Sequence, residues 1–587
     1  MKRIRKYGTG LLMTVLMLFT VSSCDLTELD INQDPNNPAQ ASLDLLLTNV
    51  ELNASSTFAG NLNDATMGFL ALTTSFDDFS MTNSSWNNTW NYLYGNPLKD
   101  LDGMIKATAQ QRADGAPNPY YEGIAKTLKA YYFSLMVDLW GKVPYDEAFG
   151  GDAEQQNLAP AFEDGAAIYA KLFTLLDEAM VHFGETSPVS VKGDVIYGGD
   201  EELWAAAARS LKLRLLLQVS RADGSVIPAI QTLISESLTD PVNKGLIGDA
   251  FSATGKYKDF QFTFGALTNP DDRHPMYQDG YSGGEAGYSY FGHQFMYEML
   301  VPLTVGGTVP GDPRAPFYFK RQTDKVLDIN DPTQKQTMPC SQRTDCIYGY
   351  FPLSNTVSQG VYNNPDASTL TTAQKQYLAG FFGRDRSDPS GIPNDNPLRT
   401  TVGLYPAAGL YDDEAEAGGG NQGRGDGIFP MITSWMVKLY MIEANLALGV
   451  PLPGTDARTL FQEAMEEQFA KVNSFVDKDP DAVAITNARR DAYINDQLSK
   501  YDGATDKLGI VLKQAWFMNF GNGFEVYNTF RRTGYPKGLQ TPMQRPRQFA
   551  LRFPYAQDEI NLNPNTPNVV YDSPTDAVFW DVLKFQF

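Results

Sequence analysis

Apolar side chains recur every three or four residues through much of the chain, and this spacing predicts amphipathic helices. In the segment that Pro119 opens, the repeat consists of Tyr121, Ile124, Leu128, Tyr131, Leu135 and Leu139. Further helices are predicted at 41–58, 168–183, 204–215, 431–448, 457–472 and 509–520, and one more carries Trp90, Tyr94, Leu98, Leu101 and Ile105. Successive amphipathic helices joined by short turns are typical of stacked helical hairpins. We therefore expect a mainly α fold in which helical hairpins form the scaffold.

The stretch 222–429 differs from the helical parts on either side of it. It is rich in Gly, Pro, Asn, Asp, Tyr and Phe, which predicts irregular loops with small helices and a few short strands. Irregular spans of this length are uncommon in compact domains unless they serve a function. We expect a single domain over 41–587, with a helical scaffold at 41–221 and 430–587 and a ligand-binding region at 222–429.

The first residues form an export signal. Four basic residues within positions 2–6 precede an apolar run at 11–21, which is too short to cross a bilayer as a permanent helix. Small residues then lead to Cys24 in a pattern that resembles a lipobox. The pattern predicts removal of residues 1–23, acylation of Cys24 and a polar tether over 24–40; ordinary cleavage with a free cysteine is the alternative.

Charge and cysteine content narrow the classes of function. The formal net charge of −22 argues against nucleic-acid binding and against binding to an anionic membrane surface, both of which need positive charge. Cys340 and Cys346 lie in one loop, where they form either a local disulfide or two free thiols. The nearby sequence has no histidine, so we expect no zinc site there, and we expect no metal or other cofactor.

Three patterns resemble catalytic motifs, and each has a simpler explanation. The sequence 280–284 fits G-x-S-x-G around Ser282, but it lies in a Tyr/Gly loop instead of after a strand. The glycines of 418–423 follow an acidic loop, and no strand precedes them. The carboxylates at Asp77–Asp78 and at 412–414 are adjacent in loops, where such side chains are usually solvated. We therefore expect a protein that is not an enzyme; a surface hydrolase is a minor alternative.

Binding chemistry is concentrated in two loops, 76–86 and 275–291, which combine aromatic and polar residues. Sugar rings stack on flat aromatic side chains, and their hydroxyl groups need polar partners. The predicted site consists of Trp86, Tyr281, Tyr288 and Tyr290 as stacking platforms, with Asp78, Asn83 and Glu285 as polar partners. Trp86 precedes a helix and is the preferred surface residue. The alternative is that most of these side chains pack inward and hold the loops.

The segment 509–565 contains the most distinctive sequence. A helix ends before 534–536, because Gly534 tolerates a positive φ and Pro536 cannot donate a hydrogen bond. Five arginines cluster in this acidic protein: Arg531, Arg532, Arg545, Arg547 and Arg552. We expect them to pair with carboxylates and to fix the C-terminal segment to the helices.

Several parts of this segment occur together in one known family. The sequence Arg531-Arg532-Thr533-Gly534-Tyr535-Pro536 is followed by Arg552-Phe553-Pro554-Tyr555 and then by Asn561-Leu562-Asn563-Pro564-Asn565. Gly311-Asp312-Pro313-Arg314 and the tether sequence match as well. The chain therefore resembles the SusD/RagB family of nutrient-binding lipoproteins of Bacteroides-type outer membranes.

The resemblance implies a fold with four tetratricopeptide-like hairpins and a position in the cell outer membrane, anchored through lipid such as palmitate. It also implies a SusC-like TonB-dependent barrel as partner, with the chain acting as the lid that captures an oligo- or polysaccharide for uptake. Capture of oligopeptides is the alternative within the same family.

Overall fold

The computed structural model describes residues 42–75, 78–151, 157–248, 258–282, 290–300, 311–321, 381, 383–387, 400–413, 423–542 and 548–585. Several predicted features lie outside these ranges: the signal peptide, the tether with Cys24, Glu285, Tyr288, Cys340, Cys346, Arg545 and Arg547.

Helices dominate the N-terminal part of the chain. They are α2 (Leu43–Thr57), η1 (Phe58–Leu62), α3 (Asn63–Phe69), η2 (Asn83–Trp86), α4 (Asn87–Gly95), α5 (Pro97–Ala113), α6 (Pro119–Trp140), α7 (Gly165–Phe183), α8 (Glu201–Val219), η3 (Gly224–Val226), α9 (Ile227–Thr239) and α10 (Pro241–Lys244). Neighbours along the chain pack together, as α5 does on α6, α6 on α7 and α7 on α8. These antiparallel pairs are the predicted helical hairpins.

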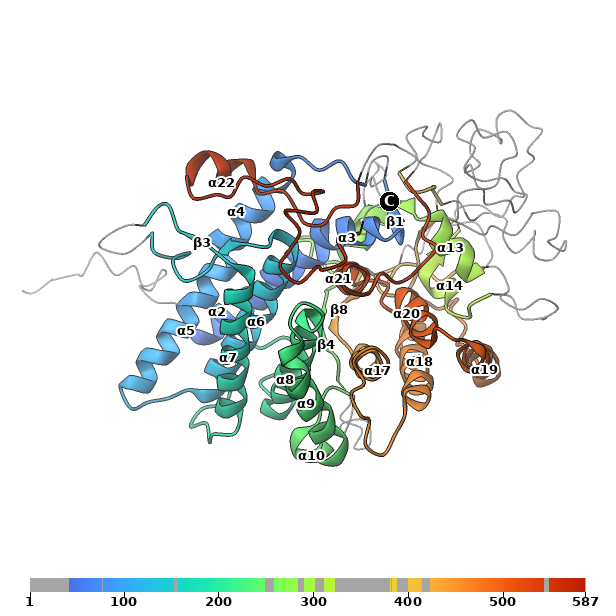
Figure 1. The fold of residues 1–587 in the computed structure, drawn as a ribbon, viewed down its shortest axis with the longest axis horizontal. Coiled ribbons are helices and arrows are strands. Elements are labelled where there is room, and N and C mark those ends of the chain that lie inside the picture. The colour runs from blue at the N-terminus through green and yellow to red at the C-terminus, as the bar shows by residue number, and fades with distance from the viewer. Residues whose placement is uncertain are drawn as a thin grey trace, which may run out of the picture.

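A second helical set forms the C-terminal part. It comprises α17 (Ser434–Leu448), α18 (Ala457–Asn473), η7 (Val476–Lys478), α19 (Asn487–Gly503), α20 (Lys507–Met518), α21 (Gly523–Thr533) and α22 (Gln557–Leu562). In Figure 1 this set, in orange and red, lies beside the N-terminal helices in blue and green, and α21 lies between the two sets. The predicted mainly α fold with helical hairpins is confirmed.

The middle of the chain supplies short elements over this frame. They are β4 (Phe260–Thr263), α12 (Pro275–Tyr277), η4 (Gln278–Ser282), β5 (Tyr290–Phe291), α13 (His293–Leu300), α14 (Ala315–Tyr318), β6 (Phe319–Lys320), β7 (Thr401–Val402) and β8 (Ile428–Ile432). Together with β1 (Thr73–Thr74), β2 (Val143–Pro144) and β3 (Phe162–Glu163), the strands form antiparallel pairs β1–β5, β2–β3, β4–β8 and β6–β7. The expectation of few, short strands is therefore confirmed for the described residues.

Two helix boundaries differ from the prediction for local reasons. The single helix expected from Trp90 to Ile105 is divided, because α4 ends at Gly95 and α5 begins at Pro97. Asn96 has φ −129° and ψ −91°, and Pro97 has no N–H to continue the hydrogen-bond ladder of α4. The helix expected from 431 starts at Ser434, because β8 extends to Ile432 and pairs with β4.

The arginines of the C-terminal segment connect it to the scaffold, as predicted, although their partners differ. Arg532 pairs with the carboxylate of Glu443 on α17. Arg531 instead donates to the carbonyl groups of Leu551 and Asp138, at 2.9 and 2.7 Å. Arg552 donates to the carbonyl of Trp140 at the end of α6. The expected carboxylate pairing is thus correct for Arg532, whereas Arg531 and Arg552 donate to backbone carbonyls, among them those of Asp138 and Trp140 in the last turn of α6, which have no partner within the helix.

The Gly311-Asp312-Pro313-Arg314 motif performs a similar task inside the fold. Arg314 is fully buried, and its Nε donates to Asp312 Oδ1 at 2.8 Å. Its Nη1 donates to Gln468 on α18 at 2.8 Å, and the guanidinium lies over the Phe469 ring. The motif therefore attaches the middle region to the C-terminal helices.

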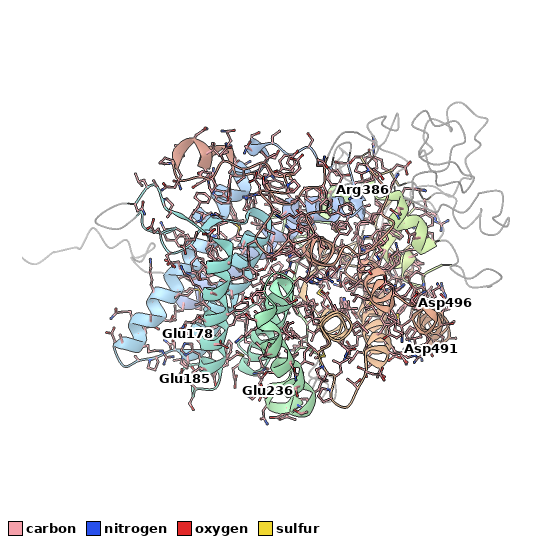
Figure 2. All side chains as sticks on the ribbon, in the orientation of Figure 1. Glu178, Glu185, Glu236, Arg386, Asp491 and Asp496 are labelled. Atoms are coloured by element: carbon pink, nitrogen blue, oxygen red, sulfur yellow. The ribbon has the colours of Figure 1, made fainter. Side chains whose placement is uncertain are left out.

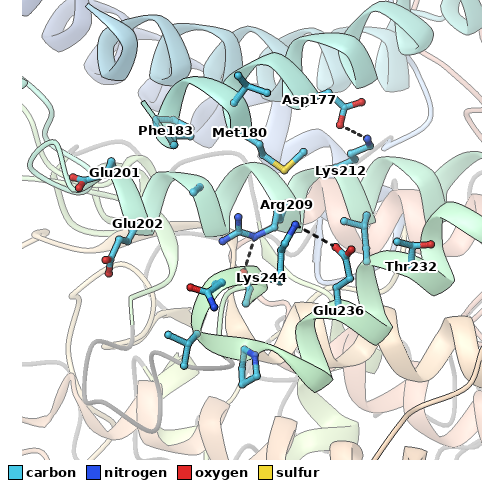
Figure 3. Close-up of a pocket in the computed structure, with 18 of the residues that line it drawn as sticks. Asp177, Met180, Phe183, Glu201, Glu202, Arg209, Lys212, Thr232, Glu236 and Lys244 are labelled. Carbon is cyan, nitrogen blue, oxygen red and sulfur yellow. Dashed lines mark hydrogen bonds and ion pairs between the residues drawn. The ribbon is translucent and has the colours of Figure 1, made fainter. Parts of the chain in front are cut away.

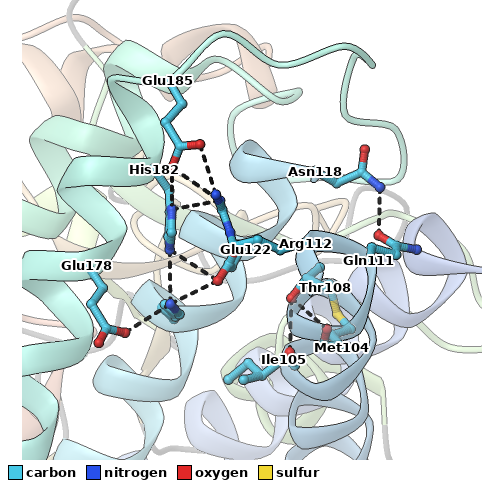
Figure 4. A network of polar contacts seen from close by, with 11 residues as sticks. Met104, Ile105, Thr108, Gln111, Arg112, Asn118, Glu122, Glu178, His182 and Glu185 are labelled. Carbon is cyan, nitrogen blue, oxygen red and sulfur yellow. Dashed lines mark hydrogen bonds and ion pairs between the residues drawn. The ribbon is translucent and has the colours of Figure 1, made fainter. Parts of the chain in front are cut away.

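A polar network joins α5, α6 and α7 near one end of the scaffold (Figure 4). Arg112 donates to Glu122 at 2.8 Å and to Glu185 at 3.1 Å. His182 Nδ1 lies 2.7 Å from Glu185, and its Nε2 lies 2.9 Å from Lys126 Nζ. His182, on α7, also lies 3.0 Å from Arg112 Nη2 on α5, so this histidine connects its own helix to α5 and α6.

Charged side chains lie mainly at the periphery. Figure 2 shows Glu178, Glu236, Asp491 and Asp496 along the outer edges, whereas Arg386 lies within the molecule and is 1% exposed. Within the described ranges, no helix combines the length and hydropathy needed to cross a bilayer.

Candidate ligand-binding site

The two loops predicted to bind ligand meet at one place in the fold. Strand β1 leads into the first loop and β5 ends the second, and the two strands pair antiparallel, with Thr73 opposite Phe291 and Thr74 opposite Tyr290. Segments more than two hundred residues apart in sequence therefore lie side by side, with β1 at the upper edge of Figure 1.

A cleft of about 40 Å³ opens where these strands meet the 400–402 segment. Its lining combines carboxylate, hydroxyl, thioether and aromatic groups, contributed by Asp64, Thr73, Met276, Asp279, Gly280, Tyr290, Phe291, Thr400, Thr401 and Val402. Drug-sized ligands occupy about 300–1,000 Å³, so this cleft holds a small part of a ligand at most. Residues 283–289, which include the predicted Glu285 and Tyr288, lie outside the described ranges.

Tyr281 is held firmly beside the cleft. Its hydroxyl donates to the carbonyl of Val402 at 2.6 Å and accepts from the N–H of Leu410 at 3.2 Å. Its ring stacks on Tyr277 with centroids 5.0 Å apart, and burial raises the pKa of Tyr281 to about 12. The side chain remains partly exposed, and the preceding residue, Gly280, lines the cleft, so Tyr281 keeps more open surface than Trp86 or Tyr290.

Tyr290 forms a wall of the cleft and offers little open surface. It is 5% exposed, and the guanidinium of Arg384 lies 5.1 Å from its ring centroid. This burial contradicts the prediction that Tyr290 is an open stacking platform.

Asp78 is engaged in the turn after β1. Oδ1 accepts from Ser75 N at 2.6 Å, and Oδ2 accepts from Thr74 Oγ1 at 2.6 Å and from Ser387 Oγ at 3.1 Å. Burial raises the pKa of Asp78, while the hydrogen bonds from Thr74 and Ser75 act in the opposite direction. These contacts make Asp78 a structural residue that holds the first loop to the 383–387 segment.

Trp86 corrects the prediction of a surface residue. The side chain is 5% exposed, and its ring lies 4.6 Å from that of Phe553 in the C-terminal segment. Nearby, Asn83 donates from Nδ2 to the carbonyl of Tyr555 at 2.8 Å. Both residues serve to attach the C-terminal segment, because that segment covers the face that local sequence leaves open.

The other tryptophans of the chain are buried like Trp86. The sequence contains 7 tryptophans, all within the described ranges, and each is buried: Trp86, Trp90, Trp140, Trp204, Trp435, Trp516 and Trp580. Stacking on a ligand must therefore use tyrosine or phenylalanine rings.

Sequence reasoning missed the polar groups that other segments bring to the cleft. Asp64 comes from α3, and its Oδ1 lies 3.4 Å from Thr73 Oγ1. Thr401 belongs to β7, and Thr400 is the residue before this strand. Asp279 was within the predicted loop and could have been chosen by its proximity to Tyr281. The other three carry no local signal, because only tertiary contacts place them here.

The catalytic motifs have structural explanations where they are described. Ser282 is the last residue of the π-helical turn η4, which follows α12, whereas a nucleophile elbow requires a strand before the serine. Asp412 accepts from Arg321 at 2.8 Å and Asp413 from Lys320 at 2.5 Å, so cations neutralise both carboxylates. The described residues contain no group of three or more metal-ligating side chains.

Comparison with known proteins connects this fold to a family. Residues 35–259 match a SusD-like family model whose description reads "Starch-binding associating with outer membrane". No curated protein matches the chain.

Solved structures match over most of the chain. A SusD/RagB family protein from Bacteroides thetaiotaomicron is 16% identical, with a TM-score of 0.60 over 90% of this chain and 95% of its own. A chitin-binding SusD homologue from Flavobacterium johnsoniae is 14% identical, with a TM-score of 0.58 over 92% of this chain and 100% of its own. A protein described as chitin-binding is 18% identical, with a TM-score of 0.62 over 92% of this chain and 100% of its own. At these identities the likeness shows a shared fold.

Proposed function

We propose that this chain, which belongs to the SusD-like family, binds an oligo- or polysaccharide at the outer membrane and delivers it to a SusC-like TonB-dependent transporter. In this proposal it is a lipoprotein anchored through Cys24, exposed at the cell surface, and it acts as the lid of the transporter. The observation that carries the proposal is the β1–β5 pair, which joins the two polar and aromatic loops at a single cleft.

The chemistry of the cleft suits a neutral carbohydrate. A sugar ring presents C–H faces to an aromatic ring and hydroxyl groups at its rim. Tyr281 supplies a fixed ring, while the carboxylates of Asp64 and Asp279 can accept hydrogen bonds from sugar hydroxyls. Thr400 and Thr401 add hydroxyl groups to the lining of the cleft.

The proposed site is narrower than the sequence prediction. It keeps Tyr281, and it keeps Glu285 and Tyr288 as sequence predictions, because they belong to the seven residues between Ser282 and Tyr290. The proposed site leaves out Trp86, Asp78 and Asn83, because their contacts hold the fold together. It adds Asp64 and Asp279, which line the cleft.

Calorimetric titration of the mature protein tests the class of ligand. Chitohexaose, maltoheptaose and an uncharged hexapeptide would be titrated separately; we expect binding of an oligosaccharide and none of the peptide. The two structural relatives described as chitin-binding make chitohexaose the first choice. Binding of the peptide alone would replace the proposal by oligopeptide capture, and release of shorter sugars would indicate a hydrolase.

Substitution at the cleft tests the site. Tyr281→Ala should weaken oligosaccharide binding by about tenfold or more, in line with the ~1–3 kcal/mol that aromatic stacking contributes in other ligand complexes. Tyr92→Ala is the matched control, because Tyr92 lies on α4 and is 40% exposed. Equal affinity of both variants and the parent protein, with unchanged melting temperatures, would remove the site from this cleft.

Two further measurements test the membrane setting. Metabolic labelling with palmitate should mark the parent protein and leave Cys24→Ser unlabelled. Affinity purification from detergent-solubilised outer membranes should recover a barrel transporter with the chain; its repeated absence would contradict the role as a lid.

A further inference from the structure

A second and larger hollow lies in the helical scaffold, between α7, α8, α9 and α10 (Figure 3). Its volume is about 840 Å³, within the range of about 300–1,000 Å³ typical of small-molecule sites. It shares no lining residue with the β1–β5 cleft. In Figure 1, α10 lies at the lower edge of the molecule and β1 at the upper edge.

Helical periodicity turns one face of each of three helices toward this groove. The lining residues follow spacings of three and four along α7 (Asp177, Met180, Val181, Gly184), α8 (Ala205, Arg209, Lys212) and α9 (Ala229, Thr232, Leu233, Glu236). The opposite face of α8 carries Trp204, Leu211 and Leu215 into the core. The groove is thus a consequence of the hairpin packing, with α10 at its end.

The cations in the groove are not equivalent. Lys212 pairs with Asp177, and Lys244 lies 3.9 Å from Glu236. Arg209 donates from Nε to the carbonyl of Gly245 at 3.0 Å, and no carboxylate of the described residues lies within ion-pair distance of it. Its two Nη groups therefore have no anionic partner in the part of the chain that the structure describes.

Arg531 and Arg552 also lack a carboxylate partner, but their Nη groups donate to backbone carbonyls, and no such contact of the Arg209 Nη groups occurs within the described residues. The chain carries a net charge of −22, so carboxylates are abundant, yet none is placed against this guanidinium. Burial lowers the pKa of Arg209, and the nearby charge of Glu236 acts in the opposite direction. Binding of an anion to a partly desolvated cation of this kind is favourable when charge-assisted hydrogen bonds form between them.

Apolar side chains form part of the groove lining. Met180, Phe183 and Leu233 form the walls, and Val181 and Val242 lie at the rim with 66% and 79% of their surface exposed. At the N-terminal end of α8, Glu201 and Glu202 also line the groove. These two carboxylates repel anions, and because the repulsion grows with the charge of the ligand, they disfavour polyanions more than a single carboxylate.

We propose that this groove binds an organic monocarboxylate with an apolar body. The carboxylate accepts hydrogen bonds from the Nη groups of Arg209, and the body packs between Met180 and Leu233. A guanidinium suits this role because its fork of N–H groups matches the two oxygens of a carboxylate. The carboxylate can belong to a small free acid or to the C-terminus of a peptide.

Titration of the mature protein with matched acid and amide pairs tests the proposal. The probes are 4-phenylbutyrate and 4-phenylbutanamide, and the peptide N-acetyl-Ala-Phe as the free acid and as the amide. We expect each acid to bind about tenfold or more tightly than its amide, because the amide lacks the negative charge. Tighter binding of the peptide acid identifies a peptide C-terminus, and tighter binding of phenylbutyrate identifies a small free acid; both support the proposal.

Variants locate the binding. Arg209→Met should reduce acid affinity about tenfold or more, and Arg209→Lys should retain part of it, because lysine keeps the charge without the fork. Arg458→Met is the control, since Arg458 pairs with Asp502 at 2.8 Å outside the groove. Equal affinity for acid and amide, a dissociation constant above about 10 mM for both acids, or full affinity in Arg209→Met would overturn the proposal. The acid–amide comparison uses the parent protein and so does not depend on the folding of any variant.

Discussion

Arg532 and Glu443 form two parallel hydrogen bonds, from Nε to Oε1 at 2.7 Å and from Nη2 to Oε2 at 2.8 Å. The pair joins α21 to α17, and both side chains are almost completely buried. Arg532 also donates to Gln218 on α8, so a single guanidinium connects three helices from both helical sets. This contact explains the burial of Arg532, whereas the adjacent Arg531 binds the carbonyl groups of Leu551 and Asp138.

Removing one partner of this pair should be costly. Arg532→Met leaves the carboxylate of Glu443 buried without its cation, and we expect the free energy of unfolding to fall by about 3–5 kcal/mol. Urea denaturation measures the change. Arg458→Met, which breaks an exposed pair, should change the free energy of unfolding far less, because solvent screens such pairs. The double variant Arg532→Met/Glu443→Met should be more stable than Arg532→Met alone, and the opposite order would contradict this explanation.

Trp86 should behave as a core residue. Trp86→Ala removes a buried ring that contacts Phe553, and we expect a loss of about 3–5 kcal/mol in the free energy of unfolding. Leu562→Ala is the control, because Leu562 is 78% exposed on the nearby helix α22 and should change stability by about 0.5 kcal/mol or less. A melting temperature unchanged in Trp86→Ala would mean that the ring lies on the surface after all.

The buried histidines should make the protein sensitive to acid. Burial lowers the pKa of His274 and of His293 to about 3, from 6.5 in the unfolded chain. Between pH 6.5 and pH 3 the unfolded state therefore binds more protons than the folded state. The stability that each neutral buried histidine contributes is complete above pH 6.5 and is lost as the pH falls through this window. In His274→Asn, an amide oxygen can still accept the hydrogen bond from Met276 N.

The measurement is the free energy of unfolding between pH 7 and pH 4.5. We expect the slope in His274→Asn to be shallower than in the parent protein by about 1.4 kcal/mol per pH unit. A slope identical to that of the parent protein would show that His274 is accessible to protons in the folded state.

Glu467 should have the opposite pH dependence. Burial raises its pKa to about 7, from 4.5, despite Lys438 at 3.3 Å. The folded state therefore binds more protons between pH 4.5 and 7, and stability decreases as the pH rises through this window. We compare the free energy of unfolding of Glu467→Gln with that of the parent protein at pH 5 and at pH 8 by thermal unfolding. The difference in favour of the variant should be larger at pH 8 than at pH 5 by on the order of 2 kcal/mol. In this variant Lys438 keeps Glu463 at 3.1 Å as a partner, so no unpaired cation is created. An equal effect of the substitution at the two pH values would argue that Glu467 is ionised throughout.

The elements of the scaffold were largely predictable, because helical periodicity is a property of neighbouring residues. The apolar repeat after Pro119 produces α6, and Gly534 ends α21 in the left-handed conformation that glycine permits, at φ 76°. The division at Pro97 also had a local signal, since proline cannot continue a preceding helix.

The candidate site was predictable to the level of its loops. The composition of 76–86 and 275–291 indicated binding chemistry, and β1 and β5 bring the two loops together. The sequence could not show which side chains remain open. Trp86 is covered by Phe553, more than four hundred residues later, and Asp64 and Thr401 reach the cleft from separate elements.

By itself, then, the sequence determined the helical hairpins, the family resemblance and the export signal as a prediction, because each depends on residues close together in the chain. Only the tertiary structure decided which aromatic rings are buried, which arginines bind carbonyl groups and which bind carboxylates. Burial and pairing depend on the segments that pack over a residue, and that packing joins parts of the chain whose separation carries no local pattern.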